Sequence, residues 1–230
     1  MAPRLDPSAG RHMRSWFAID GDLDPIDFDG NTDVRFPEAL VEAMVGLFSL
    51  RGDHVLDPFC GFGTTLNVCS RMGRIGVGFE RDERIYRYAR QTVVAPGRLY
   101  HDLAQNISTY ALPKFDLLLG SPPFRSFRDD TDVESEEYYR DLITVFRALR
   151  PHVKAGGYVV LEAVNLLGDG RPSVPRAFRC ALALTELFAF EREYVCCNRG
   201  ETEVSHGYHH SYLLVFRNTL QSTMAGEATS

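Results

Sequence analysis

Two short runs of residues have the types and the spacing that chemistry on a small, flat molecule needs. The first is Asp57–Thr65, with the sequence DPFCGFGTT, and the second is Ser121–Phe124, with the sequence SPPF. Apolar runs precede them, at His54–Leu56 and at Phe115–Leu119, and each predicts a buried strand. Open α/β sheets bind their ligands at the carboxyl ends of parallel strands. We therefore expect the two runs to lie at one edge of one sheet.

The glycine-containing run suits a nucleotide-like cofactor. Gly61 and Gly63 permit a tight turn and close approach of the backbone to a ligand, and Thr64 can cap the helix that follows. Glu80 ends the next predicted strand, near the offset at which an acidic residue receives ribose hydroxyls. Asp102 follows the strand after that, either to meet an adenine amino group or as an ordinary turn carboxylate. The run has no lysine before its threonines, which argues against a nucleoside-triphosphate loop.

The proline-containing run predicts a stiff loop that accepts hydrogen bonds. Pro122 and Pro123 have no backbone N–H, so the carbonyl oxygens beside them have few competing donors. Ser121 adds a hydroxyl, and Phe124 adds a flat apolar face. Such a loop can accept two hydrogen bonds from a planar –NH2 group while the ring stacks on the conjugated system behind it. A simple turn with a buried phenylalanine is the alternative, and the neighbouring cofactor run favours the functional interpretation.

Alternating strand and helix patterns must position these runs. The predicted strands are His54–Leu56, Arg74–Glu80, Arg98–Tyr100, Phe115–Leu119, Tyr158–Val164, Phe190–Cys197 and Ser211–Arg217. The predicted helices begin at Pro37 and cover Thr64–Met72, Arg81–Val93, Glu136–Arg150 and Pro175–Phe188. A turn at residues 153–157 separates the fourth of these helices from the strand that follows. This order predicts a doubly wound, mostly parallel α/β sheet with an antiparallel hairpin at its C-terminal edge.

Composition and charge predict one globular domain in the cytoplasm. The 230 residues are 44% hydrophobic and 24% charged, and we expect a single domain over residues 16–218 between disordered tails at 1–15 and 219–230. No apolar run approaches the roughly 18 residues that a membrane span needs. The five cysteines are odd in number and lack the spacing of a disulfide framework, which predicts reduced thiols.

At this point the sequence resembles a known family, the DNA amino-methyltransferases that act on cytosine N4 or adenine N6. Asp57–Thr65 and Ser121–Phe124 resemble the S-adenosylmethionine loop and the catalytic loop of these enzymes. Arg35–Val41 resembles the segment that covers the methionine end of the cofactor, and His210–Arg217 resembles the late strand that closes the domain. A serine at the first place of the catalytic loop is more typical of cytosine-N4 enzymes, whereas Phe124 replaces the commoner tyrosine.

The resemblance implies an S-adenosylmethionine-dependent N-methyltransferase with the class I fold, and DNA cytosine N4 is its leading target ahead of adenine N6. Amine protons bonded to Ser121 Oγ and the Pro122 carbonyl would favour a pyramidal nitrogen with a localised lone pair. The implied catalytic residues are Ser121, Pro122, Pro123 and Phe124. The implied cofactor-binding residues are Phe36, Pro37, Asp57, Pro58, Phe59, Gly61, Gly63, Thr64, Thr65, Glu80 and Asp102. No metal is implied, and His206, His209 and His210 lack a ligand partner at a recognised spacing.

Net charge leaves the substrate open. The chain carries a net charge of −6, whereas nucleic-acid readers usually show a basic footprint, and Asp20–Asp33 is dense in aspartate. Arg125 and Arg128 are the candidate phosphate contacts, or they pair with nearby aspartates. Glu162 and Asn165 follow the same sheet edge and can contact substrate or cap a helix. Two alternatives therefore stay open: methylation of a small cationic amine or protein side chain, and an inactive cofactor-binding subunit of a larger complex.

Overall fold

The computed structural model describes residues 15–19, 26–28, 31–33, 36–123, 135–166, 173–199 and 210–219. Its strands are β1 (Trp16–Ile19), β2 (Ile26–Phe28), β3 (Asn31–Asp33), β4 (His54–Asp57), β5 (Ile75–Glu80), β6 (Arg98–His101), β7 (Phe115–Gly120), β8 (Val153–Ala163), β9 (Ala189–Asn198) and β10 (His210–Arg217). Its helices are α1 (Glu38–Phe48), α2 (Thr64–Met72), α3 (Glu83–Thr92), α4 (Glu136–Leu149) and α5 (Arg176–Leu184), with 3-10 turns at Ala104–Thr109 and Arg150–His152. The predicted tails lie outside these ranges except for residues 15 and 219, and most of the acidic segment also lies outside them.

The main sheet has the order β1-β9-β10-β8-β7-β4-β5-β6. Strands β4 to β8 run parallel, and β10 lies antiparallel between β8 and β9. The predicted doubly wound sheet with an antiparallel C-terminal pair is confirmed. β1 was not predicted, because four residues become a strand only by pairing with β9, far along the chain. The strand order reverses between β4 and β7, which is the point where open α/β sheets bind ligands.

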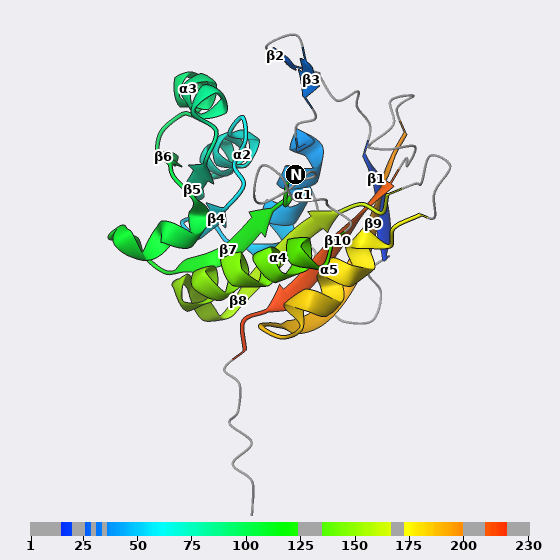
Figure 1. Cartoon of the computed structure of the whole chain (residues 1–230). Coiled ribbons are helices and arrows are strands. Elements are labelled where there is room, and N and C mark those ends of the chain that lie inside the picture. The colour runs from blue at the N-terminus through cyan, green and yellow to red at the C-terminus, as the bar shows by residue number, and fades with distance from the viewer. Residues whose placement is uncertain are drawn as a thin grey trace, which may run out of the picture.

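Helices cover both faces of this sheet, as Figure 1 shows with α4 and α5 in front and α1 behind. Alternate residues of β7 enter the two cores: Leu117 and Leu119 pack with α1, whereas Leu118 packs with α4 and α5. All three leucines are fully buried, as in a parallel strand covered on both sides. The two packed layers hold the carboxyl ends of β4 and β7 in fixed positions.

Two element boundaries differ from the prediction for local reasons. β8 begins at Val153 and runs through the predicted turn, because Gly156 N–H donates to Asn218 O (2.7 Å) and Asn218 N–H donates to Gly157 O (2.9 Å). The chain just after β10 thus extends the ladder past Gly156, which keeps a turn-like φ of +75°. α3 starts at Glu83 because the Asp82 carboxylate accepts the N–H groups of the first turn.

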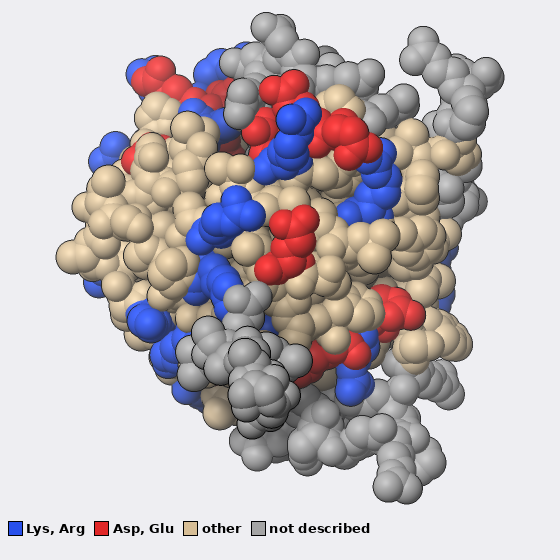
Figure 2. Space-filling model, turned by 60° about the horizontal axis from the view of Figure 1, so that its bottom comes forward, with Lys and Arg blue, Asp and Glu red and all other residues tan. Residues whose placement is uncertain are grey.

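The opposite end of the sheet carries interspersed charges. β10 ends there beside the start of β8, and Figure 2 shows basic and acidic side chains mixed over this face. Lys154 pairs with Asp116 at 2.6 Å, and Arg217 pairs with Glu191 at 2.8 Å. Among the described residues, Lys and Arg side chains are mixed with Asp and Glu side chains on the face that Figure 2 shows. None of the described helices is long and apolar enough to cross a membrane.

Candidate active site

The glycine loop (Asp57–Thr65) lies close to Gly120, the residue that precedes the proline loop (Ser121–Pro123 in the described chain), at the switch point. Asp57 ends β4, and Gly120 ends the neighbouring strand β7. A Cβ atom on Gly120 would lie 3.2 Å from Pro58 Cδ, 3.3 Å from Asp57 Oδ1 and 3.4 Å from Phe59 Cδ2. Glycine therefore permits the close approach of the two loops. The expectation that both runs share one sheet edge is confirmed.

Backbone groups and one carboxylate fix the glycine loop. Cys60 N–H donates to Phe79 O of β5 at 3.0 Å, and Gly61 N–H donates to Glu80 Oε2 at 2.9 Å. The other oxygen of Glu80 accepts Asp82 N–H at 2.7 Å. The backbone of Arg81 is a third donor to this carboxylate, which has about four lone-pair sites, so Glu80 can hold the loop and still accept one ligand hydroxyl.

The glycines of this loop permit its tight turn, and the backbone is open at Gly61. Gly61 and Gly63 have φ values of +52° and +86°, in the region that favours glycine. A Cβ on Gly61 would meet nothing closer than Phe59 O at 4.0 Å, so the loop is open there. The N-cap position of α2 is Gly63, and Thr64 is the first helical residue. No side chain caps the start of the helix. The expected Thr64 cap is wrong, and the first-turn N–H groups of α2 suit an anionic group instead.

Burial raises the pKa of the acids around the glycine loop. Asp57 is 2% exposed, and burial, with a smaller contribution from nearby Glu80, raises its pKa to about 6 although Phe59 N–H counteracts the shift. Burial likewise raises the pKa of Glu80. The pKa of the Cys60 thiol lies well above its usual range for the same reason, so this thiol packs as a small apolar group.

Asp102 organises the turn after β6. Its carboxylate accepts Leu103 N–H at 2.7 Å, Asn106 Nδ2 at 2.7 Å and Tyr110 Oη at 2.8 Å. These bonds, first that of Asn106, lower the pKa of Asp102. The turn-carboxylate interpretation is therefore confirmed, and contact with a cofactor stays a prediction.

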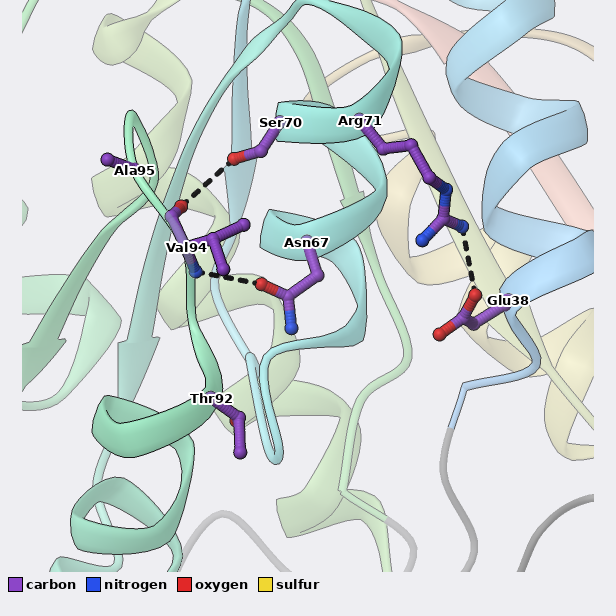
Figure 3. Close-up of a pocket in the computed structure, with 7 residues that line it drawn as sticks. All are labelled: Glu38, Asn67, Ser70, Arg71, Thr92, Val94 and Ala95. Carbon is purple, nitrogen blue, oxygen red and sulfur yellow. Dashed lines mark hydrogen bonds and ion pairs between the residues drawn. The ribbon is translucent and has the colours of Figure 1, made fainter.

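Phe36 and Pro37 lie at the start of α1. Pro37 O accepts the N–H groups of Leu40 and Val41, and Phe36 packs partly buried in the α1 core. Arg71 of α2 holds this end of α1 through Glu38 at 2.9 Å (Figure 3) and Glu42 at 2.7 Å.

A surface groove lies beside these ion pairs. Figure 3 shows Asn67 and Ser70 bonded to the backbone of Val94, each at 3.0 Å. The groove is lined by Glu38, Asn67, Ser70, Arg71, Thr92, Val94 and Ala95. Glu38 belongs to the Arg35–Val41 segment, and the other lining residues were not predicted as site residues.

Ser121 is held by a buried acid. Its hydroxyl donates to Glu162 Oε2 of β8 at 2.6 Å, and Glu162, 7% exposed, is also bonded to the Ser211 side chain. Burial raises the pKa of Glu162. Because the Ser121 hydroxyl donates its hydrogen bond to Glu162, the lone pairs of Ser121 Oγ remain to accept other hydrogen bonds. The sequence signal for Glu162 was a single acidic residue within an apolar strand. Sequence analysis had left open whether this residue contacts substrate or caps a helix.

Arg176 and Tyr138 support the proline loop, and sequence reasoning missed both. Arg176 is 1% exposed, and its Nη2 donates to Pro123 O at 3.0 Å and to Pro122 O at 3.3 Å. Tyr138 Oη donates to Pro123 O at 3.2 Å and accepts from Arg176 Nη2 at 2.6 Å. A basic residue in the first turn of a helix is unfavourable because of the helix dipole. The position of Arg176 in the first turn of α5 could therefore have indicated a special role. Tyr138 has no such signal.

The remaining predicted residues divide into two groups. Asn165 Oδ1 accepts Ala177 N–H at 3.0 Å, which confirms its capping role at α5. Among the described residues, no group of three or more His, Cys, Asp or Glu side chains could hold a metal ion. Several predicted positions lie outside the described residues: Phe124, Arg125, Arg128, His206 and His209.

Comparison with known proteins agrees with this geometry. The N6/N4 methyltransferase family model, described as DNA methylase, matches residues 26–91. The Type II methyltransferase M.HpaI of Haemophilus parainfluenzae is 42% identical over 55 residues, which are 24% of this chain and 18% of that protein. The match to M.HpaI thus spans less than a fifth of its length. The family match covers the glycine loop and ends before Ser121.

Solved structures extend the likeness to the whole sheet. TrmN from Thermus thermophilus aligns with a TM-score of 0.58 and 22% identity over 79% of this chain and 48% of that one. Magnesium protoporphyrin IX methyltransferase from Synechocystis PCC 6803, with bound S-adenosylmethionine, aligns with a TM-score of 0.54 and 14% identity over 79% of each chain. At these identities the likeness shows the fold. Residues 26–91 thus match the model of the N6/N4 DNA methylase family, and the chain has the class I fold of S-adenosylmethionine-dependent methyltransferases.

Proposed function

We propose that this protein transfers a methyl group from S-adenosylmethionine to an exocyclic amino group of a DNA base, cytosine N4 first and adenine N6 second. One observation carries the proposal: a hydrogen-bond acceptor, Ser121, directly follows the glycine that touches the glycine loop, and Glu162 fixes its hydroxyl. The family match at residues 26–91 supports DNA as the substrate.

The glycine loop and its neighbours would hold the cofactor. S-adenosylmethionine supplies an electrophilic methyl group on a sulfonium when it is bound. The N–H groups at the start of α2 suit its carboxylate, and the remaining acceptor site of Glu80 suits a ribose hydroxyl. Asp102 and the Phe36-Pro37 segment would complete the site, and an aromatic ring such as Phe59 would favour the cation.

The proline loop would prepare the amine. An exocyclic amine is a poor nucleophile because its lone pair is delocalised into the ring. Its two protons would bond to Ser121 Oγ and to the Pro122 carbonyl, which favours a pyramidal nitrogen with a localised lone pair. Holding that nitrogen in line with the methyl group of the cofactor would supply much of the rate enhancement. When the new N–C bond forms, the nitrogen must lose a proton, and the Ser121 hydroxyl with the Glu162 carboxylate offers a path to accept it.

Methyl incorporation into DNA tests this function. Purified protein, tritium-labelled cofactor and unmethylated genomic DNA should give labelled DNA, while calorimetry measures cofactor binding in parallel. Bound cofactor with no label in DNA of varied sequence contradicts the proposal.

The net charge of −6 favours one further candidate, a small cationic amine or a protein side chain as methyl acceptor. DNA affinity separates the two. A DNA substrate predicts binding that weakens steeply as salt rises, because phosphate contacts release counterions. Arg125 and Arg128 are the proposed phosphate contacts, so their replacement by glutamine should flatten this salt dependence. Salt-independent or absent DNA binding favours the amine.

A further inference from the structure

The proline loop lies between an acid from one face of the sheet and a base from the other. Glu162 alternates with Leu161 along β8, and so shares the α1 side of the strand with Val160. Arg176 begins α5, whose Ala177 and Cys180 pack in the opposite core with α4. Burial raises the pKa of Glu162, and the hydrogen bonds from Ser121 and Ser211 counteract the shift, with a smaller lowering from the charge of Arg176.

The buried guanidinium of Arg176 bonds to the proline loop. Nη2 reaches the carbonyl oxygens of Pro122 and Pro123 and the hydroxyl of Tyr138, and the guanidinium carbon lies 5.0 Å from the Tyr138 ring centre. The Cys180 thiol, one turn along α5, bonds to the same side chain. Burial of a cation is costly unless hydrogen bonds compensate it, so these partners define where the side chain sits.

A loop with two consecutive prolines needs donors from elsewhere. Neither Pro122 nor Pro123 has an N–H group, so their backbone can be anchored through the carbonyl oxygens alone. Arg176 and Tyr138 provide the N–H and O–H groups that do this, at 3.0–3.3 Å. The Pro122 carbonyl has two lone pairs, so one can bond to Arg176 while the other faces a substrate amine.

We propose that Arg176, with Tyr138, is a positioning residue for methyl transfer. It acts through the Pro122 and Pro123 carbonyls and sets the direction in which Ser121 and Pro122 present their acceptors to the amine. This inference rests on the proposed function. Misplacement of a reacting group by about 1 Å can cost roughly 100-fold in rate. Loss of Arg176 should therefore lower kcat and leave the glycine loop, which is bonded to β5, able to bind cofactor.

The decisive variants are Arg176→Met, Arg176→Lys and Tyr138→Phe, with Arg179→Met as the matched control. Arg179 lies one turn along α5, pairs with Glu136 at the surface and stacks on Tyr139. We expect Arg176→Met to lower kcat by about 10- to 100-fold with cofactor Kd within about threefold of wild type. Arg176→Lys should recover part of this loss, Tyr138→Phe should lose about threefold to tenfold, and Arg179→Met should match wild type.

Hydrogen exchange gives a second readout that needs no activity. The peptide containing Gly120 and Ser121 should exchange faster in Arg176→Met and Tyr138→Phe than in wild type or Arg179→Met. Wild-type kcat and wild-type exchange in a folded Arg176→Met overturn the inference. If Arg176→Met does not fold, Tyr138→Phe decides by the same criteria. If exchange changes as expected while wild type methylates no amine, the proposed function fails and the placement of the loop by Arg176 still stands.

Discussion

The glycine loop and the proline loop end neighbouring strands, yet different parts of the chain hold them. Backbone N–H groups of the glycine loop bond to the adjacent strand β5, at Phe79 and Glu80. The proline loop is held by three side chains from β8, α4 and α5: Glu162, Tyr138 and Arg176. The glycine loop is held through its own backbone N–H groups by the next strand along the chain, whereas the two prolines have no N–H groups and depend on side chains from later elements. Replacements in one loop should therefore affect cofactor binding and stability, and replacements in the other should affect turnover.

The largest expected effect is on turnover. Ser121→Ala removes an acceptor for the amine and should lower kcat by about 100-fold, with cofactor Kd unchanged within about threefold. Steady-state methyl transfer and calorimetry measure the two quantities. Ser108→Ala is the control, because its exposed hydroxyl contacts His152 away from the loops. Equal losses in kcat and in cofactor affinity would count against the role given to Ser121.

The second effect is on the glycine loop itself. At Gly63 (φ +86°) a Cβ would lie 2.5 Å from Val93 Cγ2, so Gly63→Ala combines backbone strain with a steric clash. We expect a loss of about 2 kcal/mol in the free energy of unfolding and weaker cofactor binding.

Gly52→Ala is its matched control, because Gly52 has φ +89° and open space around a new Cβ. Its cost should be about 1 kcal/mol, with unchanged cofactor Kd. Urea unfolding of both variants tests the difference. Equal costs would show that the Val93 contact is unimportant.

The third effect is a pH dependence of stability. The pKa of Asp57 is about 6 in the folded protein, above its ordinary 3.8, so between these values the folded state binds more protons than the unfolded chain. Stability contributed by this group is therefore present at low pH and falls as pH rises through about 6.

Asp57→Asn removes the buried charge and should raise the free energy of unfolding at pH 8 by on the order of 1–2 kcal/mol, with less gain at pH 4. Thermal unfolding across this range measures it. A variant less stable than wild type at pH 8 would contradict the assignment of a carboxylate whose burial outweighs its hydrogen bonds.

The smallest effect concerns the ion pairs that join α1 to α2. Arg71 is 49% exposed in its side chain, so solvent screens its pairs with Glu38 and Glu42. Arg71→Ala should change the free energy of unfolding by less than about 1 kcal/mol and leave kcat unchanged. A loss of turnover would instead show that the start of α1, with Phe36 and Pro37, depends on this contact.

The sequence predicted most of the sheet, because buried apolar runs and glycine turns are local signals. It placed α2 at its observed bounds, and it placed the two loops at one edge. It did not predict β1 or the early start of β8, because both depend on pairing with distant strands. For the same reason it did not assign Glu162 to the proline loop and missed Arg176. Glu162 lies 41 positions from Ser121, and Arg176 lies 53 positions from Pro123.

The identity of the methylated atom tests the central claim most directly. DNA incubated with cofactor and either wild-type protein or Ser121→Ala is digested to nucleosides and analysed by mass spectrometry. The two-loop arrangement predicts N4-methylcytosine, or N6-methyladenine, with wild type and at least about tenfold less with Ser121→Ala. A methyl group on a ring carbon, equal product from both proteins, or unmodified DNA despite bound cofactor would contradict it.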